Sequence, residues 1–541
     1  MTGQRWWRGA VVYQVYPRSF LDTDGDGVGD LPGIVERLDY IASLGVDAIW
    51  ISPFFKSPMA DFGYDIADFR DVDPLFGTLG DFDRLLAKAH GLGLKVMIDQ
   101  VLSHCSIDHE WFRESRASRD NPKADWFVWA DAKPDGTPPN NWLSIFGGVA
   151  WKWEPRRRQY YLHNFLSSQP DLNFHNPEAR AAQIDNLRFW LDRGVDGFRL
   201  DSINFPYHDA QLRDNPAKPP ELRTGRGFSP DNPYAFQYHY YNNTQPENLG
   251  LLEDVRALLD RYPDAGALGE ISSEDSLATT AEYCNERRLH MGYSFELLTE
   301  ESSPAYIRAT VEALEAKMTE GWPCWAISNH DVQRAVTRWG RDAQGDVASD
   351  ALAKQLVALV CSLRGTVCLY QGEELGLTEA NVPFEALQDP YGKAFWPTFK
   401  GRDGCRTPMP WNDDGPHAGF SHGEPWLPVP DEHRARNVEA QDADATSVLN
   451  AARAFLQWRK TQPALVLGSI RFLDAPPSIL AFVREHDGER VLVAFNLSAS
   501  AIAWTPPQAI SLLDAPGVAI ADLRDGSLQF PPRGAAYATL D

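Results

Sequence analysis

One pattern recurs through most of the chain and limits the possible folds more than any other feature. It consists of an amphipathic helical segment, a glycine, and a short apolar segment. In the first example, Ile34, Leu38 and Ile41 recur at helical spacing, and Gly45 separates them from the apolar run VDAIWIS. A glycine at this place is typical of a helix C-cap in the left-handed conformation. Continuous apolar runs indicate strands that are buried on both faces, as in a parallel sheet.

The unit occurs six times along the chain. Its glycines are Gly45, Gly93, Gly194, Gly266, Gly321 and Gly365. The segment AVVYQVY near the N-terminus and LHMGYSFEL at about 289–297 add two further apolar strands, which brings the count to eight. Eight alternating strands and helices predict an α/β fold, the (β/α)8 TIM barrel.

Two regions depart from this alternation and predict further domains. Residues 105–170 are rich in Trp, Pro, Asn and Gly, and we interpret them as a domain inserted after the third strand. From 466 to 541 the sequence alternates apolar and polar residues, with an Asp-Gly hairpin signal at 487–488. We therefore assign 1–104 and 171–465 to the barrel, 105–170 to the inserted domain, and 466–541 to a C-terminal β-sandwich domain.

Charge and cysteine content narrow the function classes. The formal net charge of the 541 residues is −24, which disfavours nucleic acid and anionic membranes as partners. The six cysteines show no CxxC pair, a pattern typical of reduced thiols. Neither a signal peptide nor an apolar run long enough to span a membrane is evident. We expect a soluble, cytoplasmic protein, a monomer or homodimer, that acts on a small neutral substrate.

Acidic residues follow several of the predicted strands. Asp201, Glu270 and Asp331 each come just past an apolar run, and Asp99 is followed by His104. Catalytic residues of TIM barrels gather where the strands end, so these side chains should meet at one rim. Several convergent carboxylates without Cys or His metal ligands favour glycoside cleavage, in which one acid attacks C1 or activates water and another protonates the leaving oxygen.

The surroundings of two of these acids suggest different roles. Arg199 lies two residues before Asp201, on the same face of its strand, and should hold Asp201 ionised and nucleophilic. Glu270 follows the apolar segment AGALG, which should raise its pKa towards that of a general acid.

Seven short segments, in order along the chain, make the prediction more specific. They are GVDAIWISPFFKSP (45–58), DQVLSH (99–104), QPDLNFHNP (169–177), GFRLD (197–201), GE (269–270), NHD (329–331) and GRDGCRTPMPW (401–411). In these segments the chain resembles the α-amylase family of glycoside hydrolases and, within it, the α-glucosidases that act on oligosaccharides. The resemblance covers roughly residues 1 to 460.

The resemblance implies a retaining α-glucosidase with a covalent β-glucosyl-enzyme intermediate. Asp201 would be the nucleophile, Glu270 the acid/base and Asp331 the stabiliser of the transition state. Contacts to the substrate would come from eight further residues: Asp61, Tyr64, His104, Phe165, Gln169, Arg199, His330 and Arg402. Among these, Asp61 and Arg402 would bind the 4-hydroxyl of a terminal glucose, which restricts the enzyme to chain ends.

Two positions refine the resemblance. The family usually carries Asn where this chain has Ser103, a change that argues against an amylase-type calcium site but not against catalysis. The residue after the nucleophile is commonly Val in members that prefer α-1,6 linkages, and here it is Ser202, which favours α-1,4 linkages such as that of maltose.

An acidic loop near the N-terminus indicates a structural cation. The segment DTDGDGVGD spans 22–30 and offers oxygen ligands at alternate positions, as an EF-hand loop does. The predicted ligands are Asp22, Asp24, Asp26, the Val28 carbonyl and Asp30. The Glu of an EF-hand is missing, since Gly33 stands at that position. Ca²⁺ is favoured over Mg²⁺, no organic cofactor is expected, and the alternative is a solvated acidic turn.

Three functions remain open from the sequence. The enzyme could hydrolyse α-glucosides, or it could transfer glucose to a sugar or alcohol; these two share the covalent intermediate. A non-catalytic protein of the same fold is disfavoured, because the three acids are retained. The aromatic-rich segment of about 205–250 could line an acceptor subsite or merely cover the barrel.

Overall fold

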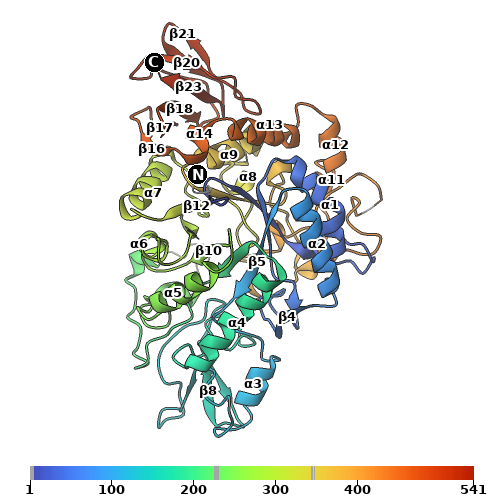
Figure 1. Ribbon diagram of the computed structural model, residues 1–541, viewed down its shortest axis with the longest axis vertical. Coiled ribbons are helices and arrows are strands. Elements are labelled where there is room, and N and C mark those ends of the chain that lie inside the picture. Colours follow the sequence, from blue (N-terminus) through green and yellow to red (C-terminus); the bar gives the residue numbers. More distant parts are fainter. Residues whose placement is uncertain (1–4, 224–230, 343–344, 347, 416, 541) are drawn as a thin grey trace.

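The computed structural model describes residues 5–223, 231–342, 345–346, 348–415 and 417–540. Eight parallel strands form a closed barrel in the order β1-β15-β12-β11-β10-β9-β5-β2, so the predicted TIM barrel is confirmed (Figure 1). All eight strands coincide with the predicted apolar runs to within one residue: β1 (Val11–Val15), β2 (Ala48–Ile51), β5 (Lys95–Val101), β9 (Gly197–Asp201), β10 (Gly266–Ile271), β11 (Met291–Ser294), β12 (Trp322–Ala326) and β15 (Thr366–Tyr370).

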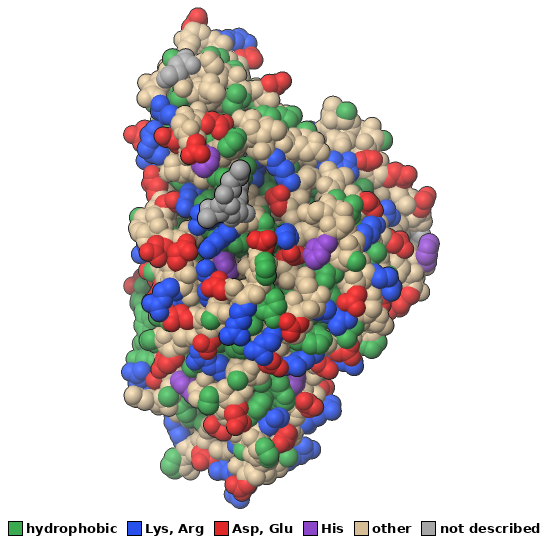
Figure 2. All heavy atoms as spheres, viewed as in Figure 1, with side chains coloured by type: hydrophobic (Ala, Val, Ile, Leu, Met, Phe, Trp, Pro, Cys, Tyr) green, Lys and Arg blue, Asp and Glu red, His purple; other side chains and the backbone are tan. Residues whose placement is uncertain are grey.

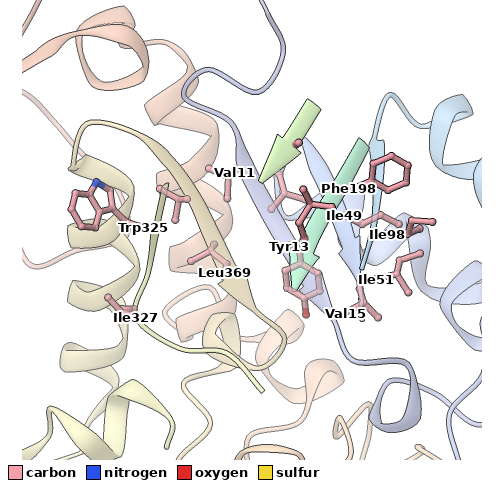
Figure 3. Packing of buried hydrophobic residues seen from close by; sticks show 14 of the residues in the cluster. Val11, Tyr13, Val15, Ile49, Ile51, Ile98, Phe198, Trp325, Ile327 and Leu369 are labelled. Atoms are coloured by element: carbon pink, nitrogen blue, oxygen red, sulfur yellow. The ribbon is translucent and has the colours of Figure 1, made fainter. Parts of the chain in front are cut away.

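Alternate residues of most barrel strands face two different apolar cores. Val11 and Val15 belong to a large apolar cluster that also contains helix residues such as Leu38, and Figure 3 shows part of this packing. Val12 and Trp50 belong to a separate, smaller cluster inside the barrel. Because side chains alternate with period two, burial on both faces produces the continuous apolar runs of the sequence.

The helices that follow the barrel strands pack around the outside of the barrel. They are α1 (Leu31–Ser43), α2 (Leu79–Gly91), α4 (Pro177–Arg193), α5 (Asn248–Leu259), α6 (Ser276–Tyr283), α7 (Pro304–Lys317) and α9 (Asp350–Ser362). Gly194 caps α4 in the left-handed conformation, as predicted. The prediction is wrong for Gly266 and Gly321, which lack a positive φ. At Gly321 a Cβ would approach the Cys284 carbonyl oxygen to 2.2 Å, so close packing requires this glycine.

The segment after β5 leaves the barrel. Residues 105–170 contain α3 (Glu110–Ser115) and a three-stranded sheet of β6 (Trp129–Ala130), β8 (Gln159–Leu162) and β7 (Trp151–Glu154). A small apolar cluster around Trp142 and Trp151 holds this sheet together. A short hairpin of β3 (Phe55–Lys56) and β4 (Asp68–Val72) precedes it in the chain.

The C-terminal region is all β, and it lies at the opposite end of the molecule from β8 (Figure 1). It begins after the helices α13 (Val448–Lys460) and α14 (Pro463–Leu467). One sheet has the order β16-β17-β18-β23-β20 and the other β19-β22-β21. Asp487 and Gly488 both have positive φ and join β17 to β18, so the predicted Asp-Gly hairpin is confirmed.

The strands of these two sheets are antiparallel and short: β16 (Ser469–Phe472), β17 (Ile479–His486), β18 (Glu489–Asn496), β19 (Ile502–Trp504), β20 (Ile510–Leu512), β21 (Asp522–Arg524), β22 (Ser527–Phe530) and β23 (Ala535–Leu540). Acidic and basic side chains are interspersed on the face shown in Figure 2. In the described part of the chain, no helix is both long and apolar enough to cross a bilayer. All six cysteines are buried free thiols.

Candidate active site

A polar layer lies above the apolar interior of the barrel, at the ends of four neighbouring strands. Met97 and Leu268 belong to the apolar interior, and Asp99 and Glu270 each stand two residues further along the same strands. The register pairs Asp99 with Arg199 and Glu270 with Tyr293. Since alternate residues share one face of a strand, the sequence spacing itself directs these polar side chains to the inside of the barrel mouth.

Arg199 connects the acids of this layer. Its Nη1 donates to Asp201 Oδ1 at 2.7 Å and to Asp99 Oδ1 at 2.8 Å. Its Nη2 lies 2.5 Å from Glu270 Oε1 and donates to the Tyr293 hydroxyl at 3.1 Å. The two predicted catalytic carboxylates therefore contact two nitrogens of one guanidinium, which fixes their relative position.

The single positive charge of Arg199 lies beside three buried carboxylates, those of Asp99, Asp201 and Glu270. The balance between burial and this charge determines their pKa values. Burial raises the pKa of Asp201 to about 7 and that of Glu270 to about 7, although Arg199 lowers both. Burial likewise raises the pKa of Asp99 to about 6. The raised pKa of Glu270 was expected. For Asp201 the expectation is corrected: burial and the neighbouring carboxylates outweigh Arg199, so this group is not simply held ionised.

Asp331 has the opposite environment. Arg406 Nη2 donates to Asp331 Oδ1 at 2.9 Å and Arg402 Nη1 at 3.3 Å, and His330 Nε2 lies 3.3 Å from Oδ2. Burial would raise the pKa of Asp331, but these three neighbours hold it well below its usual range. Asp331 therefore supplies a permanent negative charge at neutral pH.

His330 is neutral and positioned from both sides. Burial lowers its pKa to about 3. The Gln14 amide donates to His330 Nδ1 at 2.8 Å, so the proton lies on Nε2, which is 2.6 Å from the Tyr64 hydroxyl. Tyr64 in turn donates to Asp99 Oδ2 at 3.0 Å and stacks on the His330 ring at 5.3 Å between centroids. The Tyr64 ring is thereby held rigidly in the wall of the site.

Asp61 and Arg402 are brought together, as expected, by an ion pair of 2.9 Å between Oδ1 and Nη2. Gln169 Nε2 donates to the second oxygen of Asp61 at 3.0 Å. The Arg402 guanidinium also binds Asp389, with Nη2 at 2.9 Å from Oδ1 and Nε at 3.1 Å from Oδ2. Burial raises the pKa of Asp389 and Arg402 lowers it, with a net fall to about 2. Asp389 thus fixes the orientation of Arg402.

These groups open into one cavity of about 460 Å³. It is lined by eight of the eleven predicted catalytic and substrate-binding residues: Asp61, Tyr64, His104, Phe165, Asp201, Glu270, Asp331 and Arg402. The other three, Gln169, Arg199 and His330, are fully buried and lie behind the wall, where they bind lining residues. The segment at about 205–250 also contributes to the lining, through Tyr234 and Tyr238 among others.

Sequence reasoning missed four contributors to the site. Tyr293, near the end of β11, donates to Glu270 Oε1 at 3.1 Å, and the apolar run around it gives no sign of this role. Arg406 lies within the segment GRDGCRTPMPW, so its motif was noticed but its role was not. The backbone N–H of Ser202 donates to Glu270 Oε2 at 3.0 Å. Nothing in the sequence around Asp389 pointed to Arg402.

The acidic loop folds tightly. Asp22, Asp24 and Asp30 each place a carboxylate oxygen within 4.8 Å of the others, and they are the only such group of three among the described residues. The predicted ligand Asp26 stands outside this group, and its Oδ1 accepts from the Val28 N–H at 2.8 Å. Asp30 also caps α1 by accepting from the Gly33 N–H at 2.7 Å. A cluster of hard oxygen donors fits Ca²⁺ or Mg²⁺.

Both the barrel region and the C-terminal β region of the chain match models of known protein families. Residues 14–468 match the model of the alpha amylase catalytic domain, and residues 470–540 match that of the maltogenic amylase C-terminal domain. The first match spans well over half of the chain.

Similar proteins share almost the full length. A probable alpha-glucosidase from Rhizobium meliloti (strain 1021) is 54% identical over 99% of this chain and 97% of its own. An oligo-1,6-glucosidase from Parageobacillus thermoglucosidasius is 38% identical over 91% of this chain and 90% of its own.

Solved structures extend the likeness to the fold. The alpha-glucosyl transfer enzyme XgtA has a TM-score of 0.98 and 69% identity, and the match covers 100% of both chains. The trehalulose synthase MutB from Pseudomonas mesoacidophila MX-45 has a TM-score of 0.88 and 35% identity, again over 100% of both chains.

Proposed function

This chain belongs to the alpha-amylase family of glycoside hydrolases, and on that premise we propose that it is a retaining α-glucosidase acting on the non-reducing terminal glucose of short α-glucosides. The observation that carries the proposal is the contact of Asp201 and Glu270 with one guanidinium, that of Arg199, at the mouth of the barrel. Asp331 lines the same cavity. The family motif assigns Asp201 as nucleophile and Glu270 as acid/base.

The reaction uses these groups in two steps. In the first, Asp201 attacks C1 while Glu270 gives its proton to the glycosidic oxygen, whose bond to C1 breaks. In the second, water or another hydroxyl attacks C1, the ester bond to Asp201 breaks with its electron pair returning to the carboxylate, and Glu270 takes the proton. Three carboxylates around Arg199 favour retention of a proton near neutral pH, as an acid/base requires.

Transition-state charge and substrate choice are assigned to other residues. The permanently ionised Asp331 would stabilise the positive charge that develops on the sugar ring. The Asp61–Arg402 pair would bind the terminal 4-hydroxyl and close the cavity to the middle of a chain. Ser202 after the nucleophile supports a preference for α-1,4 linkages such as that of maltose.

Transfer of glucose is the second candidate function. The solved structure described as an alpha-glucosyl transfer enzyme is 69% identical to this chain, which favours substantial transfer to a sugar or alcohol acceptor. Both functions share the glucosyl-enzyme, and only the second-step acceptor differs.

One experiment tests both candidates. The protein is incubated with maltose, and proton NMR follows the anomer of released glucose and the transfer products. The reducing-end glucose leaves maltose as a mixture of both anomers, so the glucose from the non-reducing residue is read as the excess over that mixture. We expect this excess to be α-glucose at first, together with trisaccharide. An initial excess of β-glucose, or no turnover of any α-glucoside, would overturn the proposal.

We further infer that the loop around Asp22, Asp24 and Asp30 holds a structural Ca²⁺, or Mg²⁺ in its place. The donors are the carboxylates of these three residues. An ion here would neutralise repulsion among acids at the start of α1. A cytoplasmic location and a monomeric or homodimeric state are retained as predictions, and no organic cofactor is proposed.

A further inference from the structure

An ion pair lines the cavity that holds the catalytic acids, and the reaction proposed above does not use it. Lys218 Nζ lies 2.8 Å from Glu274 Oε2, and the two side chains are 14% and 25% exposed. Both residues line the same cavity as Asp201 and Glu270. Because the pair is accessible from this cavity, it can contact a molecule bound there.

The position of the pair along the chain places it on the leaving-group side. Glu274 follows Glu270 by four residues, in the loop after β10. As acid/base, Glu270 must stand beside the glycosidic oxygen, so the loop that continues from it faces the part of the substrate beyond that oxygen. The terminal 4-hydroxyl, by contrast, is assigned to Asp61 and Arg402, which come from other loops.

The Glu274 side chain and the Lys218 backbone are both held by hydrogen bonds to the segment that follows β9. Glu274 Oε1 accepts from the His239 N–H at 3.0 Å. The backbone of Lys218 donates to Phe236 O at 2.8 Å, next to an isolated antiparallel bridge between Ala217 and Gln237. Lys218 Nζ also lies 5.3 Å from the centre of the Tyr238 ring. The pair therefore joins the segment that follows β9, which carries Lys218 and His239, to the loop that follows β10, which carries Glu274.

The ion pair is explained better by a role in binding a molecule in the cavity than by a contribution to the stability of the fold. Partly exposed ion pairs contribute little to folding. An ammonium has three N–H donors, and each oxygen of an ionised carboxylate can accept more than one hydrogen bond. The pair therefore keeps capacity to donate and to accept beyond the contacts with each other and with His239. Adjacent hydroxyls of a sugar ring need a donor and an acceptor side by side, and an alcohol with one hydroxyl does not.

We propose that Lys218 and Glu274 form the acceptor subsite for a sugar, binding two hydroxyls of the ring whose third hydroxyl attacks the glucosyl-enzyme. This inference rests on the proposed function and specifies its acceptor. The attacking oxygen bonds to C1, the C1–Asp201 ester bond breaks with its electrons returning to Asp201, and the hydroxyl proton passes to Glu270. The pair acts by positioning the acceptor and takes no proton itself.

The test compares Glu274→Gln and Lys218→Met with the parent protein. α-Glucosyl fluoride is the donor, because its small leaving group leaves the acceptor subsite empty. Maltose or hydroquinone is added as acceptor, and chromatography measures transfer product against free glucose. We expect each variant to lower the transfer-to-hydrolysis ratio with maltose about tenfold, while the ratio with hydroquinone changes less than twofold. The double variant should lose no more than either single one, since the two groups act together.

A matched pair controls for removal of a charge. Glu315 and Arg364 lie 2.8 Å apart with side chains 25% and 18% exposed, and they are not among the residues that line the cavity. Glu315→Gln should leave both ratios unchanged. Unchanged transfer-to-hydrolysis ratios in Glu274→Gln and Lys218→Met would overturn the inference. Equal losses of transfer to maltose and to hydroquinone would also overturn it, because the pair would then only shape the cavity. Absence of all turnover in the parent protein would instead overturn the proposed function.

Discussion

Asp61 and Arg402 are 341 residues apart in the chain, yet Arg402 Nη2 donates to Asp61 Oδ1 at 2.9 Å in the cavity wall. Gln169 binds Asp61 from one side and Asp389 binds Arg402 from the other. Each charge of the pair is thus held by a second partner. A rigid pair of this kind is suited to bind one hydroxyl from both sides, because both its donor and its acceptor are already oriented.

The first prediction concerns this pair. Asp61→Asn replaces the charged acceptor of the proposed 4-hydroxyl contact by a neutral amide. Hydrogen bonds to charged groups contribute about 1.5–3 kcal/mol, so kcat/KM for maltose should fall by up to roughly 10- to 150-fold. The exposed Asp185→Asn, which removes the ion pair with Arg70, is the control and should change kcat/KM less than twofold. Steady-state kinetics make the comparison. Equal kinetics for both variants would show that the pair does not bind substrate.

The second prediction concerns pH. In the proposed mechanism, activity requires Asp201 ionised and Glu270 protonated, and burial raises the pKa of each to about 7. Because the acids share Arg199, loss of the first proton makes loss of the second harder. We therefore expect a bell-shaped kcat/KM profile centred near pH 7: acid protonates Asp201, and alkali deprotonates Glu270. With α-glucosyl fluoride, which needs no acid assistance, the fall at high pH should weaken. Full activity with maltose at pH 9 would contradict this account.

The third prediction concerns the acidic loop. A cation that binds only the folded state, at a hundredfold excess over its Kd, stabilises by about 2.7 kcal/mol. A chelator should therefore lower the melting temperature by a few degrees, and added Ca²⁺ should restore it. Asp22→Asn should remove this response, whereas Asp83→Asn, which alters an exposed pair with Arg193, should keep it. If neither chelator nor Ca²⁺ changes the melting temperature of the parent protein, the acidic loop holds no ion.

The fourth prediction concerns linkage preference. Ser202 has a φ of 41°, and its backbone N–H donates to Glu270. Ser202→Val should raise the ratio of isomaltose to maltose turnover several-fold. It should also lower the melting temperature, because branched side chains are strained at positive φ. Ser202→Ala, which removes the hydroxyl without branching, controls for loss of that group. If the isomaltose-to-maltose ratio of Ser202→Val stays within twofold of that of the parent, Ser202 does not determine the preference for α-1,4 linkages.

The barrel and much of the site follow from local sequence patterns. Apolar runs located all eight strands, since both faces of each strand are buried. The period-two spacing of Arg199 and Asp201 indicates that they share a face of the strand. In the structure the Arg199 guanidinium binds the Asp201 carboxylate at 2.7 Å. These features depend on residues close together in the chain, so the sequence reports them directly.

Other features depend on contacts that no local pattern reveals. Asp389 was not anticipated, because it acts only through Arg402, and loop packing brings the two together. The pKa of Asp201 differs from the prediction, because the sequence shows the adjacent charges but not the complete burial of the carboxyl, which raises its pKa more than Arg199 lowers it. The sequence predicts a helix cap at Gly321, yet the close approach of the Cys284 carbonyl from another segment is what requires this glycine.

In the proposed mechanism Asp201 carries the glucosyl group on the enzyme. Reaction with 5-fluoro-α-glucosyl fluoride, followed by peptide mass spectrometry, would identify that residue, because the fluorine slows breakdown of the intermediate. We expect one 5-fluoroglucosyl group on the peptide that contains Asp201, and none in Asp201→Asn. A label on another carboxylate, or turnover that continues in Asp201→Asn, would contradict this mechanism.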